Sequence, residues 1–227
     1  MVTIRKVPLV PGEIYHIFNK SIAEYKIFNS RKEFLRIKEL VSYYQWEKID
    51  LRFSRREMTD QLDTRRVSDK LVDILAYCLM PTHIHLILKQ LKDKGISVFM
   101  SQISNSYARY FNIKHERKGS LWESQFKNIL ITNDEQLLHL TRYIHLNPST
   151  AFLVNNPEDW EFSSYKEFLR EVEGKNRICS FEDTIDINPA SYKKFVEDRI
   201  SYQRELAKIK DLILETPDGH PTGGRGG

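Results

Sequence analysis

Two histidines lie two residues apart, at positions 83 and 85, within the apolar run Met80-Pro81-Thr82-His83-Ile84-His85-Leu86-Ile87-Leu88. Side chains of a β-strand alternate between faces, so His83 and His85 would point the same way while the residue between them enters a core. Two neutral imidazoles side by side suit a divalent metal ion. The spacing indicates half of a metal site, although two histidines on a solvated strand face explain the pair alone equally well.

The residues that follow the pair argue against three familiar sites. A histidine-triad nucleotide hydrolase needs a third alternating histidine, but position 87 is Ile. A cupin would carry a carboxylate soon after the pair, where Lys89 and Gln90 stand. A zinc deaminase needs His-x-Glu and a later Cys-x-x-Cys, and the sequence has neither. The remaining ligands and the reactive group must therefore come from elsewhere in the chain.

Tyr143 and Asn147 form a second chemically capable pair, at the end of a segment with helical periodicity over residues 134–146. Positions four residues apart share a helix face. Pro148 is expected to end the helix, which makes this sharing approximate at Asn147. A capping box would start the helix, formed either by Asn133 with Gln136 or by Thr132 with Glu135. A tyrosine hydroxyl beside two imidazoles and an amide oxygen is an arrangement for attack on a phosphodiester.

The apolar patterns predict the elements that would position these groups. Strands are expected over residues 12–18, 71–79, 83–88 and 126–131, and helices over 31–46, 97–112 and 134–146. Ser30 and Glu33 form a capping box for the first helix. The order matches the βαββαβ pattern, so we expect an α+β, ferredoxin-like antiparallel sheet with helices on one face. Residues 50–70 are expected to form a charged loop with some helix, and helices are expected again over 160–169 and 191–214.

Composition narrows the class of protein further. The chain has 227 residues, 41% of them hydrophobic, and a net charge of +4, which agrees with a polyanionic partner without requiring one. No apolar run is long enough for a transmembrane helix, and the N-terminus lacks the apolar core of a signal peptide, so a cytoplasmic protein without membrane partners is expected. Cys78 and Cys179 lie far apart and are interpreted as reduced thiols.

Six short motifs, in this order, resemble those of HUH-type single-tyrosine transposases, in the branch known as REP-associated tyrosine transposases. They span residues 12–169 and together are far more specific than any one of them. The motifs are Tyr15-His16-Ile17-Phe18-Asn19, Met80-Pro81-Thr82-His83-Ile84-His85-Leu86, Tyr107-Ala108-Arg109-Tyr110-Phe111-Asn112, Gly119-Ser120-Leu121-Trp122-Glu123, Arg142-Tyr143-Ile144-His145-Leu146-Asn147-Pro148 and Trp160-Glu161-Phe162-Ser163-Ser164-Tyr165.

The resemblance implies a nucleoid-associated enzyme that cleaves and rejoins hairpin-containing single-stranded DNA through a 5′-phosphotyrosine. His83 and His85 match the family's metal-binding histidines, Tyr143 the nucleophile and Asn147 the third, polar ligand; the ion would be Mg²⁺ or Mn²⁺. The expected domains are a catalytic domain over residues 1–170, a helical extension over 171–216 and a disordered tail over 217–227. Relatives include dimers and monomers, so a homodimer is left open.

Other side chains have competing interpretations. A basic patch and one aromatic ring are candidates for contacts with phosphates and bases, against the alternatives of a solvated loop and a buried anchor. They are Arg109, Lys114, Arg117, Lys118 and Lys127, with Trp122 for stacking. His16 is interpreted as structural, and Tyr107 and Tyr110 as packing residues. Two other function classes remain: a non-catalytic nucleic-acid-binding regulator, and a metal-dependent phosphodiesterase that uses water.

Overall fold

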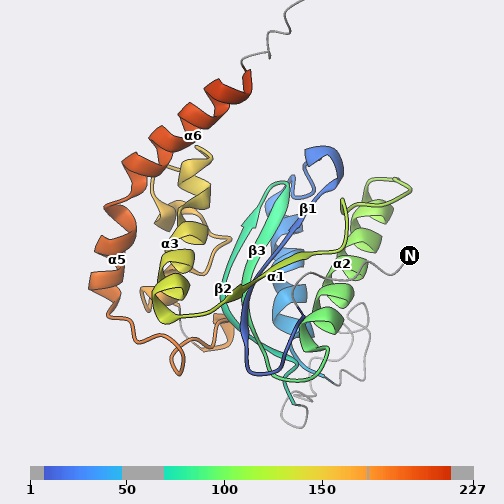
Figure 1. Ribbon diagram of the computed structural model, residues 1–227. Helices are drawn as coiled ribbons and strands as arrows, with labels where there is room; N and C mark the ends of the chain where they lie inside the picture. The colour runs from blue at the N-terminus through green and yellow to red at the C-terminus, as the bar shows by residue number, and fades with distance from the viewer. Residues whose placement is uncertain (1–7, 48–68, 173, 216–227) are drawn as a thin grey trace, which may run out of the picture.

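The computed structural model describes residues 8–47, 69–172 and 174–215, without the side chains of residues 175 and 208–215. Four strands form an antiparallel sheet in the order β2-β3-β1-β4 (Figure 1). Their bounds are β1 Ile14–Lys20, β2 Val72–Met80, β3 His83–Gln90 and β4 Lys127–Ile131. With α1 (Arg31–Tyr44) between β1 and β2 and α2 (Gly95–Lys114) between β3 and β4, the predicted βαββαβ fold is confirmed.

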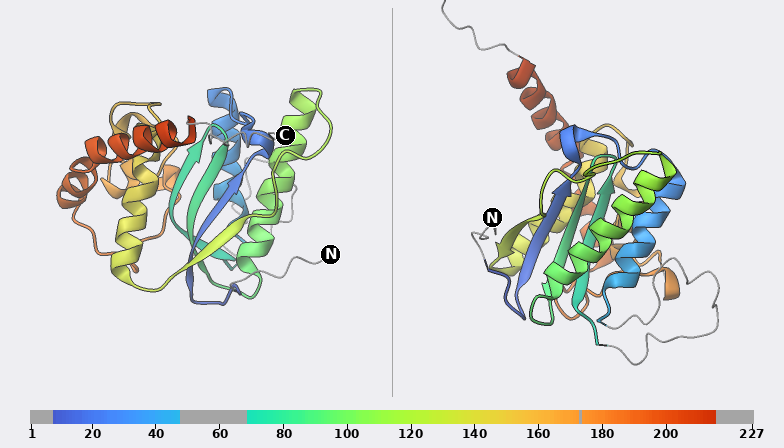
Figure 2. Two further views of the ribbon diagram at one scale, coloured as in Figure 1. Left: turned by 45° about the horizontal axis from the view of Figure 1, so that its top comes forward. Right: turned by 90° about the vertical axis from the view of Figure 1, so that its right-hand side faces the viewer.

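Helices cover both faces of the sheet (Figures 1 and 2). The two helices of the βαββαβ unit, α1 and α2, lie together on one face, as predicted. The opposite face carries α3 (Asp134–Thr150), beside which lie α5 (Pro189–Glu197) and α6 (Ile200–Glu215). None of the helices in the described part of the chain has both the length and the apolar character needed to cross a membrane.

Strand alternation divides the sheet chemically. Side chains directed toward α1 and α2 are apolar and almost fully buried: Tyr15, Ile17, Ile84, Leu86 and Leu88 are each at most 1% exposed. The histidines of β3 alternate with these residues and therefore point toward α3. The apolar face thus fixes the register that puts the polar side chains on the other face.

Helix α3 begins where the sequence predicts but ends later. Asn133 caps it, its side chain accepting a hydrogen bond from the Gln136 backbone at 2.8 Å. The prediction that the helix stops before Pro148 is wrong, because the helix continues to Thr150. Pro148 lies in the last turn, where a missing N–H removes only one helical hydrogen bond. Asn147 remains helical, and its carbonyl accepts a hydrogen bond from Ala151 at 2.9 Å.

The segment after α3 covers the outer edge of β2. Backbone hydrogen bonds of 2.9 Å join Leu79 to Phe162, Tyr77 to Ser164 and Ile74 to Ser180. A covered edge cannot pair with another chain. Because residues 160–164 form turns and a bridge to β2, the helix predicted over 160–169 is reduced to α4 (Tyr165–Phe168). The long helix predicted over 191–214 is divided into α5 and α6. The predicted tail 217–227 and most of the predicted loop 50–70 lie outside the described residues.

A buried polar network joins α3 to the C-terminal part of the chain. His145 is fully buried, with Nδ1 2.7 Å from the Tyr192 hydroxyl and Nε2 2.8 Å from the Ser164 hydroxyl. Burial lowers the pKa of His145 to about 3. Arg204 of α6 adds a second link, donating from Nε to the Ser149 carbonyl at 2.9 Å. The C-terminal helices therefore hold α3 against the sheet.

Because His145 is neutral in the folded protein, the free energy of unfolding should decrease as the pH falls. Its folded pKa of about 3 lies below the unfolded value of about 6.5. Its contribution is therefore complete above pH 6.5 and is lost as the pH falls toward 3, at about 1.4 kcal/mol per pH unit. Urea unfolding of the metal-free chain at pH 7.5 and pH 5 should show this loss. His145→Asn should be less stable at both values but should show a smaller loss on acidification.

The exposed histidine His139, on the same helix, provides the control. His139→Asn should retain the acid-dependent loss of the unmodified chain. An equal acid-dependent loss in His145→Asn would show that His145 does not titrate on unfolding as described.

Candidate active site

His83 and His85 lie side by side at the start of β3. In the sheet they are opposite Lys20 and Phe18 of β1, which fixes them on one face. The two rings are 4.9 Å apart between centroids and nearly perpendicular, at 88°. The prediction that the two imidazoles point the same way is confirmed.

Each histidine is held through its Nδ1 atom. The Thr82 hydroxyl lies 2.9 Å from His83 Nδ1, and His16 Nε2 lies 2.9 Å from His85 Nδ1. Burial, together with the charge of Lys20, lowers the pKa of His83 to about 4. Burial, with His83, His16 and Lys20 as further causes, also brings the pKa of His85 well below its ordinary value. Both imidazoles are therefore neutral near pH 7, the state in which they bind metals.

Tyr143 approaches this pair from α3. Its ring centroid lies 6.0 Å from that of His85, with the rings almost perpendicular. The side chain is 45% exposed, so an outside molecule can reach the hydroxyl. Partial burial raises the pKa of Tyr143, and the Asn147 side chain, one helical turn later, opposes that shift by hydrogen bonding. The structure thus brings Tyr143 to the histidine pair, from which it is far apart in the sequence. Asn147 follows Tyr143 on the same helix and acts on it.

The potential metal donors at the site are two imidazoles and the amide of Asn147. In the described residues, no three His, Cys, Asp or Glu side chains are placed to hold a metal together. A thiolate-rich structural zinc site is therefore a poor match. Two neutral imidazoles suit a divalent transition metal. They would leave the other coordination positions to phosphate oxygens or water, ligands that Mg²⁺ and Mn²⁺ also accept. Asn147 would bind such an ion through its amide oxygen, because the amide nitrogen has no lone pair for a metal. In the described part of the chain, Asn147 Nδ2 is buried without a hydrogen-bond partner of good geometry.

The side chains predicted to contact DNA are distributed over several surfaces. Lys127 lies opposite Phe18 in the sheet and is on the histidine face. Arg109 and Lys118 are exposed, on α2 and in the loop after it. Arg117 donates to the Ser120 carbonyl at 2.8 Å, which orders that loop. Trp122 is only 8% exposed and donates to the Ser104 carbonyl at 3.1 Å, so its ring packs against the core and is not presented to a base.

Lys114 is engaged in an ion pair. It lies 2.7 Å from the carboxylate of Glu33, whose side chain is fully buried, and His115 lies 2.6 Å from the same oxygen. Burial alone would raise the pKa of Glu33, but the hydrogen bonds from Lys114, His115 and the Asn29 backbone lower it to about 2. Glu33 also accepts from the Ser30 backbone at 3.1 Å, completing the predicted capping box. Lys114 therefore joins the end of α2 to the start of α1.

Other candidate residues lie away from the site or in the core. Tyr107 is fully buried and its hydroxyl donates to the Ile27 carbonyl at 2.6 Å, in agreement with a packing role. His139 is exposed on α3, where it contacts Arg142 at 2.8 Å. Cys78 and Cys179 are both buried and unpaired, in agreement with reduced thiols.

Two residues beside the histidine pair were not predicted as site residues. His16, interpreted as structural, contacts His85, and Lys20 lies opposite His83 on the same face. The signal was present in the sequence, because positions 16, 18 and 20 alternate to one face of the first strand. It could not be used without the pairing of β1 with β3, which local patterns do not reveal.

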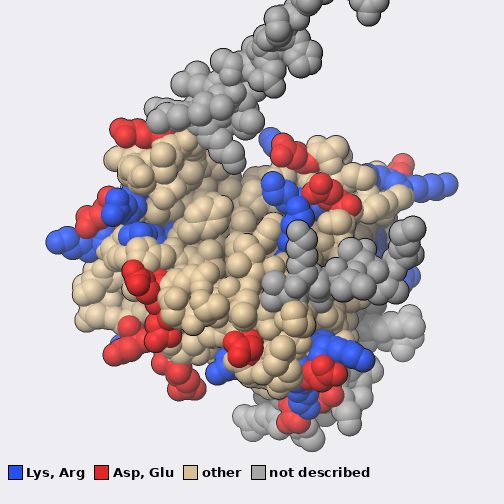
Figure 3. Space-filling view, viewed as in Figure 1, with Lys and Arg blue, Asp and Glu red and all other residues tan. Residues whose placement is uncertain are grey.

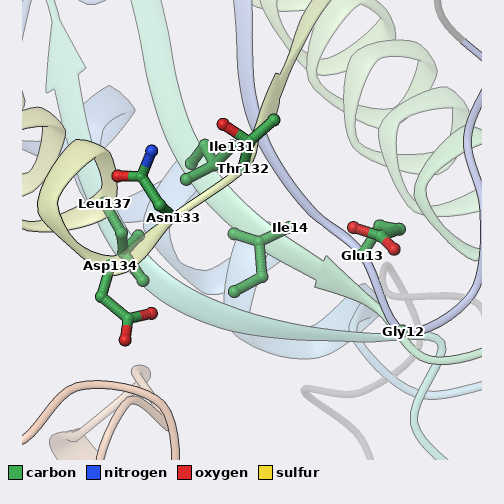
Figure 4. A pocket seen from close by; sticks show the side chains of 8 residues that line it. All are labelled: Gly12, Glu13, Ile14, Ile131, Thr132, Asn133, Asp134 and Leu137. Atoms are coloured by element: carbon green, nitrogen blue, oxygen red, sulfur yellow. The ribbon is translucent and has the colours of Figure 1, made fainter.

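A shallow pocket lies at the other end of the sheet (Figure 4). It is lined by the start of β1, the end of β4 and the first turn of α3, and the carboxylates of Glu13 and Asp134 flank it. Ile14, in its wall, is six positions along β1 from Lys20, so the pocket is separate from the histidine pair. On the surface seen in Figure 3, acidic and basic side chains are interspersed around an uncharged centre.

With the sheet topology, the histidine pair and the tyrosine on α3 described, the chain can be compared with known proteins, and it is similar to IS200-like transposases. Residues 54–147 match the family model described as "Transposase IS200 like", and this stretch includes both histidines, Tyr143 and Asn147. The resemblance to REP-associated tyrosine transposases is also confirmed. A Haemophilus influenzae protein provisionally named as one is 25% identical over 103 residues, which cover 41% of this chain and 58% of that protein. The match therefore spans little more than half of that relative.

One solved structure agrees on the fold. The structure of a REP-associated tyrosine transposase bound to a REP hairpin superposes with a TM-score of 0.50 at 15% identity, covering 82% of this chain and 99% of that one. A Deinococcus radiodurans R1 structure, provisionally named as a transposase, is less similar, with a TM-score of 0.35 at 15% identity over 63% of this chain and 95% of that one.

Because Lys114 pairs with the buried carboxylate of Glu33, replacing Lys114 tests whether its role is structural. Lys114→Ala should lower the free energy of unfolding by about 1 to 3 kcal/mol, because a buried charge loses one of its partners. Lys118→Ala, in the neighbouring exposed position, should change it by less than about 0.5 kcal/mol. Urea unfolding monitored by circular dichroism measures both. Equal stability of the two variants would contradict a structural role for Lys114.

Proposed function

We propose that this chain is a single-strand DNA endonuclease and strand-transfer enzyme of the tyrosine transposase type. The observation that carries the proposal is the position of Tyr143, an accessible hydroxyl beside two neutral, convergent histidines. The match to the IS200-like family over the stretch that contains these residues supports it. A nucleic-acid-binding regulator would need neither the histidine pair nor the tyrosine.

The proposed chemistry exchanges one phosphodiester for another. The Tyr143 oxygen attacks phosphorus, the bond to the 3′ oxygen breaks, and the proton lost by the tyrosine is balanced by one gained by the 3′-hydroxyl. A 5′-phosphotyrosine keeps the energy of the cleaved bond, so attack by a 3′-hydroxyl rejoins DNA without ATP. Asn147, one helical turn after Tyr143, is proposed to orient the Tyr143 hydroxyl during both steps. The effect of its side chain in lowering the Tyr143 pKa supports this role.

His83 and His85 are proposed to hold Mg²⁺ or Mn²⁺, with Asn147 at the third, polar position. When bound, such an ion supplies Lewis-acid polarisation of the scissile phosphate. Thr82 and His16 occupy the Nδ1 sides of the two imidazoles. The Nε2 atoms are therefore the ones left to face the ion.

The proposed substrate is single-stranded DNA that carries a hairpin. The relative of known structure was solved with a REP hairpin, and the chain shares its fold. Lys20 and Lys127 lie on the histidine face, where they are suited to bind phosphates on either side of the scissile bond. The other strongly basic segment, around Lys114, is partly committed to Glu33 and is a weaker candidate.

Tyr143→Phe should abolish the covalent protein–DNA adduct while leaving hairpin binding within about twofold. The adduct is detected as a shifted band on a denaturing gel after incubation with a hairpin-tailed, labelled oligonucleotide and Mn²⁺, and EDTA should suppress it. Tyr25→Phe is the matched control, because Tyr25 is 48% exposed against 45% for Tyr143. It should form the adduct normally.

The same experiment separates the other functions. Adduct formation by Tyr143→Phe would show that another residue attacks. Cleavage without any adduct, unaffected by Tyr143→Phe, would identify a phosphodiesterase that uses water. Hairpin binding with no cleavage by the unmodified chain under any divalent ion would identify a regulator.

Lys20→Ala and Lys127→Ala should each weaken binding of the oligonucleotide and reduce the slope of log affinity against log salt by about 0.7 to 0.9. Fluorescence anisotropy between 50 and 300 mM KCl measures both quantities. Lys89→Ala is the control, since Lys89 is on the same face of the sheet but opposite Ile14, at the far end of β1. An effect of Lys89→Ala as large as those of the other two would show that the far end of the sheet also binds DNA.

A further inference from the structure

A second histidine contact lies behind the candidate metal site. His16 Nε2 and His85 Nδ1 are 2.9 Å apart, and the two rings lie edge to edge, with centroids 5.2 Å apart and planes 17° from parallel. His16 is 6% exposed and His85 is 7% exposed, so water does not compete for this contact. Phe18 packs against both rings, at 5.2 and 6.1 Å between centroids, and keeps the pair in place.

The position of His16 suggests that it acts on His85 and does not bind a metal itself. Its Nε2 is already occupied by the other imidazole, and no three-ligand group that includes it occurs in the described part of the chain. A hydrogen bond between two neutral imidazoles contains one proton, which belongs to either nitrogen. If it belongs to His85 Nδ1, the lone pair of His85 is on Nε2, facing outward. If it belongs to His16 Nε2, His85 Nε2 carries a proton and cannot bind a metal.

We propose that His16 is a positioning residue that accepts a hydrogen bond from His85 Nδ1–H and thereby fixes both the tautomer and the ring orientation of His85. This inference rests on the proposed function, because fixing the tautomer matters only if the Nε2 lone pair of His85 binds a divalent ion together with His83. The tautomer itself is a property of the metal-free protein. Thr82 stands in the corresponding place beside His83 Nδ1. Such partners of metal-binding histidines commonly change metal affinity by 10- to 100-fold.

The tautomer is read directly by long-range ¹H–¹⁵N NMR of the full chain labelled with ¹⁵N-histidine, free of metal at pH 7.5. His85→Gln identifies the His85 signals by their loss. In the unmodified chain, His85 is expected as the Nδ1–H form. His16→Gln supplies an amide oxygen as acceptor and should retain that form, whereas His16→Phe and His16→Leu supply none and should shift His85 toward Nε2–H.

Titration with Mn²⁺ alone, followed by calorimetry, gives the second readout. Affinity should fall 10- to 100-fold in His16→Phe and His16→Leu and recover at least partly in His16→Gln. His139→Phe replaces an exposed histidine that does not touch the site and should bind Mn²⁺ normally. Comparing these variants therefore distinguishes the effect of removing the hydrogen-bond acceptor beside His85 from the effect of removing a histidine elsewhere in the chain.

The outcomes distinguish this inference from the proposed function. An Nε2–H tautomer of His85 in the unmodified chain would overturn the role of His16, and so would unchanged tautomer and Mn²⁺ affinity in the variants without an acceptor. A Nδ1–H tautomer that is lost in those variants supports the role of His16 even if the unmodified chain binds no Mn²⁺. In that case it is the proposed metal chemistry that fails.

Discussion

The site depends on the strand register of the β2–β3 hairpin. Met80 pairs with His83 and Cys78 with His85, and the apolar residues that alternate with the histidines, Ile84 and Leu86, are buried beneath α1 and α2. A slip of one residue would turn both imidazoles into that core and expose Ile84 and Leu86. The energy of burying one face of the sheet is therefore what holds the chemical groups on the other.

The second half of the site depends on how α3 is docked. A helix carries Tyr143 at a fixed place along its axis, but its position over the sheet is decided by contacts outside that helix. His145, two residues after Tyr143, is enclosed by Tyr192 and Ser164, and Arg204 binds the last turn. The segment over residues 160–204 is thus part of the scaffold for the tyrosine, and it packs into the same core as the βαββαβ unit.

Histidines in this chain serve different purposes because their surroundings differ. His145 is fully buried among hydroxyl groups and joins elements. His83 is partly exposed at the first position of β3, an inner strand, and its Nδ1 contacts the Thr82 hydroxyl. His115 contributes to the cluster that neutralises Glu33. Histidines thus contribute to the core, to the helix ends and to the candidate site. The groups that contact each imidazole ring determine which of these roles it has.

The sequence by itself determined the order of the elements, the helix caps at Ser30 and Asn133, and the shared face of His83 and His85. These follow from periodicity and local hydrogen bonding, which involve residues close together in the chain. It also gave Tyr143 and Asn147 as candidates, through the resemblance of short motifs. The course of α3 through Pro148 was not predicted, because a proline rule describes an average helix and not one held by neighbours.

Only the tertiary structure decided which distant groups meet. The pairing of β1 with β3 places His16 and Lys20 beside the histidine pair, and the docking of α3 brings Tyr143 to His85. It also assigns Lys114 to the buried Glu33 and Trp122 to the core, although both read from the sequence as DNA-binding candidates. The physical reason is that the burial of a side chain and the identity of its contacts depend on elements far apart in the chain. Local sequence patterns contain little information about such contacts.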